Sequence, residues 1–77
     1  MIKESRYFQH FKGGKYELLA FGKDSENMND VVIYKALYDD GQIWVRPKDM
    51  FFANVRKNGI ETPRFREITE EEAYGKN

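Results

Sequence analysis

The side chains best suited to binding chemistry in this sequence are aromatic rings and an arginine that lie close together. Tyr34, Tyr38, Trp44 and Arg46 fall within residues 31–47, on two β-rich runs joined by a turn. Exposed rings beside a guanidinium are typical of peptide-binding hot spots and of platforms on which nucleic-acid bases stack. The structural alternative is that a barrel closes over these rings and buries them as its core. Trp44→Ala separates the two interpretations, because removing a core tryptophan costs about 3–5 kcal/mol of stability.

Further basic residues could extend this aromatic and arginine surface. His10 and Lys12 lie beside Gly13 and Gly14, and backbone amides at such a turn can hold an anion. The structural alternative to a binding role for His10, a lone histidine next to a phenylalanine, is a local hydrogen bond or simple packing. The predicted ligand-binding residues are Tyr34, Tyr38, Trp44, Arg46, His10, Lys12 and Arg64.

Catalysis is difficult to assemble from the residues available. The chain has one histidine and no cysteine, so any histidine-based nucleophile would depend on His10. The carboxylate runs at 39–40 and 70–72 lack the spacing of a cation cage, and we expect a turn and a helix start there. We therefore predict no catalytic residue, no metal site and no cofactor. A small enzyme is the third hypothesis for function, behind two kinds of binding.

Composition ranks those two kinds of binding. The 77 residues carry 13 basic and 13 acidic side chains, which give a net charge of zero. Because phosphate-driven affinity needs positive charge, a peptide or protein partner ranks first and single-stranded nucleic acid second. The nucleic-acid hypothesis requires the basic residues to gather on one side. With no cysteine, no signal-like leader and no apolar segment of membrane-spanning length, we expect a cytoplasmic protein that does not contact membranes.

Short β-rich runs separated by turns predict the fold. The first strand is expected at 15–23, the second at 31–38, the fourth at 52–57 and the fifth at 60–66, while Pro47 ends the third. Met50 and Phe51 belong to a short helical turn, and Asn58-Gly59 is a two-residue hairpin turn that places Arg56 opposite Glu61. Residues 69–72 fit a capping box that starts a short helix.

The turn at 39–41 leaves two hairpin registers open. A two-residue loop would set Lys35 opposite Arg46, and like charges directly opposite each other are unfavourable. A three-residue loop, with Gly41 in the left-handed region, instead sets Tyr34 opposite Arg46. We favour this second register, which also pairs Ala36 with Trp44 and Leu37 with Ile43. It gives an aliphatic core face made of Ile33, Leu37, Ile43 and Val45.

These elements predict a mostly β protein with five short strands. The expected architecture is a small SH3-like barrel or a bent antiparallel sheet, with one short helical turn. A single domain spans residues 7–68, since a chain this short has surface enough for one small core. Residues 1–6 and 69–77 are expected to form flexible or weakly ordered tails.

Four motifs together resemble a known family. They are His10-Phe11-Lys12-Gly13, Val32-x-Tyr34-x-x-Leu37-Tyr38, Trp44-Val45-Arg46-Pro47-x-x-Met50-Phe51 and Arg64-Phe65. In this order they are similar to the small bacterial domain-of-unknown-function family 1653, over about residues 7–68. The resemblance implies a compact β-rich domain and a set of motif positions. It implies no reaction, because no activity is established for that family.

Overall fold

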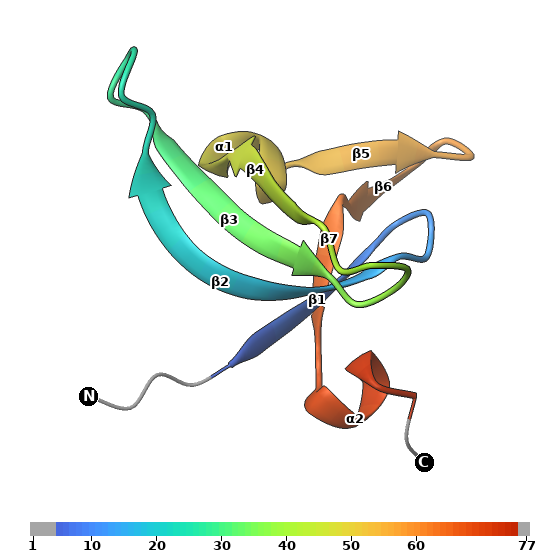
Figure 1. Ribbon diagram of the computed structural model, residues 1–77. Helices are drawn as coiled ribbons and strands as arrows, with labels where there is room; N and C mark the ends of the chain where they lie inside the picture. The colour runs from blue at the N-terminus through green and yellow to red at the C-terminus, as the bar shows by residue number, and fades with distance from the viewer. Residues whose placement is uncertain (1–4, 76–77) are drawn as a thin grey trace.

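Two antiparallel sheets and two short helices make up the described part of the chain, residues 5–75, in this computed structural model (Figure 1). The strands are β1 (Arg6–His10), β2 (Lys15–Lys23), β3 (Asp30–Ala36), β4 (Ile43–Pro47), β5 (Asn54–Lys57), β6 (Ile60–Pro63) and β7 (Phe65–Ile68). The helices are α1 (Lys48–Phe51) and α2 (Glu70–Ala73). Residues 1–4 and 76–77 of the predicted tails lie outside the described residues. No helix within 5–75 is long and apolar enough to cross a membrane.

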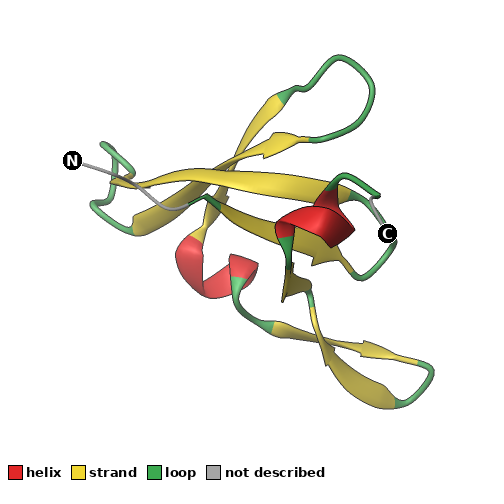
Figure 2. Ribbon diagram, turned by 90° about the horizontal axis from the view of Figure 1, so that it is seen from below, coloured by secondary structure: helices red, strands yellow, loops and turns green. Residues whose placement is uncertain are grey.

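The larger sheet is bent, in agreement with the bent antiparallel sheet that was one of the two predicted architectures. Its five strands follow the order β4-β3-β2-β1-β7, and β5 and β6 pair separately as a two-stranded sheet. The register between β2 and β3 shifts between Leu18 and Ala20, and a bulge of this kind bends a strand and increases its twist. The β5–β6 hairpin projects away from the larger sheet (Figure 2). The mostly β fold is therefore confirmed, but the predicted barrel is not closed.

Two of the seven strands were missed from the sequence. No strand was predicted before residue 15, yet β1 pairs with β2 on one side and β7 on the other. Its Tyr7 and Phe8 are both buried, each on a different face, so no alternation of polar and apolar residues is visible. The predicted fifth strand divides at Arg64 into β6 and β7, which belong to different sheets.

The predicted hairpin register between β3 and β4 is wrong by two residues. Tyr34 lies opposite Trp44, and Arg46 lies opposite Val32. Ile43 lies opposite Lys35, and the backbone N–H of Ala36, the last residue of β3, donates to the Gln42 carbonyl at 2.8 Å. The predicted Leu37–Ile43 and Ala36–Trp44 pairs are therefore absent. Because side chains alternate with a period of two, the error leaves Tyr34, Trp44 and Arg46 on one face.

The predicted core face is also wrong. Val32, Tyr34 and Ala36 are buried, whereas Ile43 and Val45 on the opposite face are 61% and 63% exposed. The face that carries Tyr34 is the inner one because large rings from other elements cover it. The main core consists of Phe8, Val32, Tyr34, Phe51 and Phe65, with Tyr16 and Leu18 packed against it.

A smaller cluster fixes the C-terminal helix. Tyr7, Ile68 and Ala73 are buried together, with Leu37 packed against them. The predicted capping box is present, since the Glu72 N–H donates to Thr69 Oγ1 at 3.1 Å and the Thr69 N–H donates to Glu72 Oε1 at 2.9 Å. The predicted Arg56–Glu61 pair is likewise confirmed.

Gly41→Val is expected to destabilise the protein by about 1–3 kcal/mol, because a β-branched residue resists positive φ. Gly41 has a φ of 71°, in the left-handed region as predicted. A Cβ there would also lie 3.1 Å from Lys35 Cε. Urea denaturation of the valine variant measures the loss, with Gly41→Asn as the control because asparagine tolerates this conformation. Equal stability of the two variants would contradict the prediction.

Candidate functional site

A pocket of about 420 Å³ opens where β1, β2, β3, β4 and β7 come together. We call it the tyrosine–arginine pocket, and its lining residues are His10, Lys12, Gly14, Tyr16, Tyr34, Tyr38, Arg46 and Phe65. Five of the seven predicted binding residues are among them. The structure thus brings residues from distant parts of the sequence to one hollow.

Strand pairing explains why these side chains meet. His10 ends β1 and lies opposite Phe65, the first residue of β7. Tyr34 on β3 and Arg46 on β4 share the inner face of the sheet, and Tyr16 on β2 pairs with Ala36 on that same face. The pocket therefore sits on adjacent strands, whose backbone hydrogen bonds hold its walls in place.

Aromatic rings form the base of the pocket. The Phe65 ring lies 5.4 Å from Tyr34 and 5.7 Å from Tyr16, in both cases edge to face. The Arg46 guanidinium carbon is 5.7 Å from the Phe65 ring centroid, within range of a cation–π contact. These contacts restrict the rotamers of the pocket side chains, so a ligand would meet a surface that is already ordered.

Two hydrogen bonds orient the polar groups. Arg46 Nε donates to the Tyr34 hydroxyl at 3.2 Å, and the Tyr16 and Tyr38 hydroxyls are 2.6 Å apart. The Nη groups of Arg46 have no hydrogen-bond partner among the described residues. A guanidinium held at Nε and free at Nη is suited to donate hydrogen bonds from its Nη groups to a carboxylate or a phosphate.

His10 has a defined tautomer. Its Nδ1 accepts the backbone N–H of Lys12 at 3.1 Å, so the proton of the neutral ring is on Nε2. Burial lowers the pKa of His10, and the positive charges of Arg46, Arg64 and Lys12 lower it further. The ring is consequently neutral at pH 7 and presents an N–H donor.

The hydroxyl of Tyr16 stays protonated at neutral pH. Burial raises its pKa, and the hydrogen bond with Tyr38 raises it further. Tyr16 therefore acts as a hydrogen-bonding phenol and not as a phenolate nucleophile.

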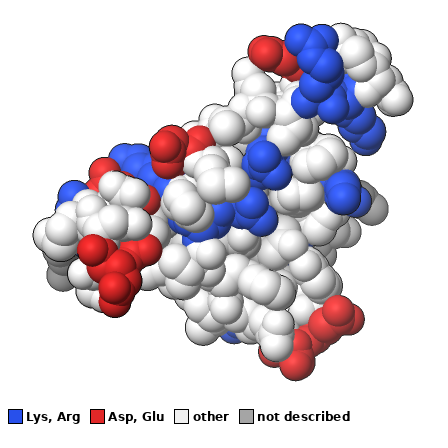
Figure 3. Space-filling view, turned by 90° about the horizontal axis from the view of Figure 1, so that it is seen from above, with Lys and Arg blue, Asp and Glu red and all other residues white. Residues whose placement is uncertain are grey.

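Positive charge surrounds the pocket without local compensation. The two ion pairs formed within residues 5–75, Arg6–Glu67 and Lys23–Asp30, lie elsewhere, and no acidic side chain lines the pocket. Lys and Arg side chains occupy the middle of one face and extend to the β5–β6 hairpin, while acidic side chains lie toward its edges (Figure 3). A neutral chain therefore has a basic face, which can attract an anion.

Two predicted binding residues lie outside this pocket. Trp44 does not line it and is 47% exposed on the sheet edge. Arg64 does not line it either, although it lowers the pKa of His10 and its buried Nε has no hydrogen-bond partner in the described structure.

Three lining residues were not predicted as binding residues: Tyr16, Gly14 and Phe65. Gly14 lies in the glycine turn beside His10 and Lys12, and Phe65 lies in the last of the four motifs. Tyr16 lies in none of them, and its place in the pocket depends on the pairing of β2 with β3.

The residues present suit anion binding more than metal binding. Within residues 5–75 no group of three or more His, Cys, Asp or Glu side chains is arranged to hold a metal ion. The donors of the pocket are a guanidinium, a lysine ammonium, an imidazole N–H and tyrosine hydroxyls, and these recognise oxyanions.

Comparisons with known proteins agree on one family. The family model "Protein of unknown function (DUF1653)" matches residues 6–67. A crystal structure of a DUF1653 protein from Bordetella bronchiseptica superposes with a TM-score of 0.75 at 24% identity, over 86% of this chain and 87% of that one. That likeness supports the fold. No curated protein matches the sequence.

Proposed function

Since the chain belongs to the family of proteins of unknown function DUF1653, whose matched segment contains the whole tyrosine–arginine pocket, we propose that it is a binding module for an anionic group. The module is non-catalytic, and the pocket holds the negative charge of its partner. One observation carries the proposal: cationic and phenolic donors converge on one hollow that no acidic residue lines.

A peptide or protein partner would present a carboxylate to this pocket. Arg46 would take the carboxylate with its Nη groups, and the Nε2–H of His10 would donate to it. The partner's neighbouring apolar groups would contact the rings of Tyr38 and Tyr16. This partner uses the tyrosine–arginine pocket alone.

Single-stranded nucleic acid is the second candidate, and the gathering of basic side chains on one face favours it (Figure 3). The argument from zero net charge against phosphate binding assumed that the charges are evenly spread, and here they are not. A phosphate would occupy the position of the carboxylate, and bases would stack on exposed rings.

Inorganic sulfate is the probe for the shared anion chemistry, because its charge stays constant between pH 5 and 8. NMR titration is expected to shift the backbone signals of His10, Gly14, Tyr34 and Arg46. Arg46→Met should weaken sulfate binding about tenfold or more, since hydrogen bonds to charged groups are the strong ones. Arg6→Met is the matched control: it removes an arginine whose partner is Glu67 and which lines no part of the pocket.

The same titration reports on His10. A bound anion offsets the positive charges that lower the His10 pKa, so this pKa is expected to rise on binding. By linkage, sulfate affinity should increase as the pH falls through the range of these two pKa values. Equal weakening of binding in Arg46→Met and Arg6→Met would refute the proposal, as would shifts spread evenly over all basic residues.

A further inference from the structure

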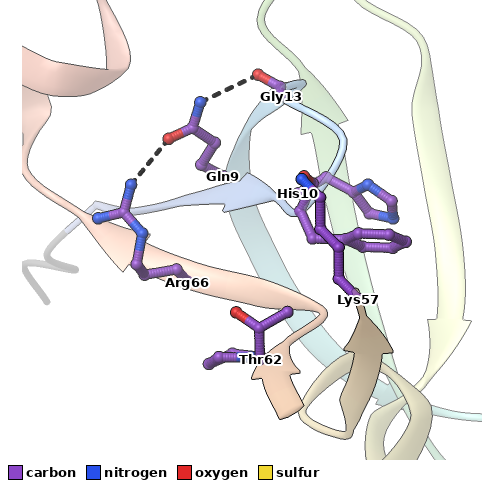
Figure 4. Close-up of a pocket in the computed structure, with 8 residues that line it drawn as sticks. Gln9, His10, Gly13, Lys57, Thr62 and Arg66 are labelled. Atoms are coloured by element: carbon purple, nitrogen blue, oxygen red, sulfur yellow. Dashed lines mark hydrogen bonds between the residues drawn. The ribbon is translucent and has the colours of Figure 1, made fainter. Parts of the chain in front are cut away.

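A second pocket, of about 270 Å³, shares His10 with the first. It opens between the β1–β2 turn, the β5–β6 hairpin and the start of β7 (Figure 4). Its lining residues are Gln9, His10, Phe11, Gly13, Lys57, Thr62, Pro63 and Arg66. The tyrosine–arginine pocket and this second pocket are therefore neighbours that share His10 as a lining residue.

The second pocket is also basic, and its guanidinium is held in position. Arg66 Nη2 donates to Gln9 Oε1 at 2.9 Å, and Gln9 Nε2 donates in turn to the Gly13 carbonyl at 3.2 Å (Figure 4). Lys57 Nζ lies 3.5 Å from the Phe11 carbonyl, which it contacts from the β5–β6 hairpin. Neither cation forms an ion pair with any carboxylate of the described residues, and no acidic side chain lines this pocket.

Each pocket combines cations with an aromatic ring at its side. Tyr38, 43% exposed, borders the first pocket, and Phe11 borders the second. The Phe11 ring is 4.6 Å from the His10 ring, with 34° between their planes. Each pocket therefore places positive charge beside a flat apolar surface.

We infer that the two pockets hold neighbouring phosphates of one single-stranded nucleic acid, with His10 between them. This inference rests on the proposed function, and it adds the second pocket and the class of ligand. A nucleic-acid strand has a negative charge at every unit and a planar base beside each charge, which matches two neighbouring cationic pockets that each adjoin an aromatic ring. An acidic peptide would contact the Tyr38 ring only through aliphatic groups, whereas the bases of a nucleic acid can stack on the rings of both Tyr38 and Phe11.

Fluorescence anisotropy with a labelled oligothymidine of about eight nucleotides tests the inference, since single-strand sites span roughly 4–16 nucleotides. A glutamate-rich peptide of equal charge is the competing ligand. Lys57→Met changes the second pocket, Arg46→Met changes the first, and Arg6→Met is the control. Lys57 is exposed, so its replacement leaves the core intact.

Lys57→Met and Arg46→Met are each expected to weaken oligothymidine binding several-fold. Each should also reduce the slope of log K against log salt concentration by about 0.7, the value for one lost phosphate contact on a single strand. Arg6→Met should change neither quantity. The glutamate peptide should bind more weakly than the oligonucleotide.

Two results would overturn the inference. If Lys57→Met binds oligothymidine with the affinity and salt slope of the wild type, the second pocket holds no phosphate. If the glutamate peptide binds as tightly as the oligonucleotide or more tightly, the ligand is an acidic protein segment. In either case the sulfate titration of Arg46→Met still reports separately on whether the first pocket binds anions.

Discussion

Phe51→Ala is expected to lower the free energy of unfolding by about 3–5 kcal/mol, the usual loss for a buried phenylalanine. Phe51 is fully buried, and its ring stacks on Phe65 with centroids 4.0 Å apart and planes 5° apart. The rings of Phe8 and Tyr34 also contact it edge to face, each with its centroid 5.2 Å from that of Phe51. Small domains are stable by only about 5–15 kcal/mol, so this loss would remove a large share of the protein's stability.

Urea denaturation followed by circular dichroism measures the effect. Phe52→Ala is the matched control, because this neighbouring phenylalanine contacts the rings of Phe8 and Phe51 but is itself 43% exposed. We expect the Phe52 variant to lose much less stability than the Phe51 variant. Similar losses would show that the stacked pair of Phe51 and Phe65 is not the centre of the core.

Truncation after Ile68 is expected to cost about 2–3 kcal/mol. The deletion removes the Thr69 cap, a loss of about 1 kcal/mol. It also removes the buried methyl of Ala73, at about 0.8 kcal/mol, and the Tyr7–Tyr74 ring contact, at about 0.5–1.5 kcal/mol. The hydrogen bond that Lys15 Nζ donates to the Glu72 carbonyl at 2.7 Å would also be lost, but this exposed contact adds little to the stability.

Thermal melts of two truncated chains make the comparison. A chain that ends at Gly75 keeps α2 and should melt close to the wild type, whereas a chain that ends at Ile68 should melt several degrees lower. A weakly ordered tail, as expected from the sequence, predicts equal melting temperatures for the two. Equal values would therefore show that α2 adds no stability.

The sequence predicted turns and strand ends well, because these depend on the backbone preferences of a few neighbouring residues. Asn58-Gly59 and Pro47 marked hairpin and strand ends correctly, because their backbone preferences operate within a few residues. Burial depends on what covers a strand from elsewhere in the chain. The Val-Ile pattern of β3 could not show that Phe51 and Phe65 cover the Tyr34 face, so the core was assigned to the opposite side.

The candidate site was predicted in part for a related reason. Tyr34 and Arg46 were placed on one face because an even register error preserves the alternation of side chains. His10 and Lys12 were suggested by a glycine turn. Tyr16 was missed because its position depends on the pairing of β2 with β3, a contact between segments that no local pattern encodes.

The exposed aliphatic side of the hairpin bears on the solubility of the protein. Ile43 and Val45 face water on β4, an edge strand of the larger sheet. Apolar edge strands promote aggregation, and Pro47 and Lys35 reduce that tendency because proline removes a backbone donor and lysine adds charge beside Ile43. At high protein concentration, precipitation should therefore start from this strand.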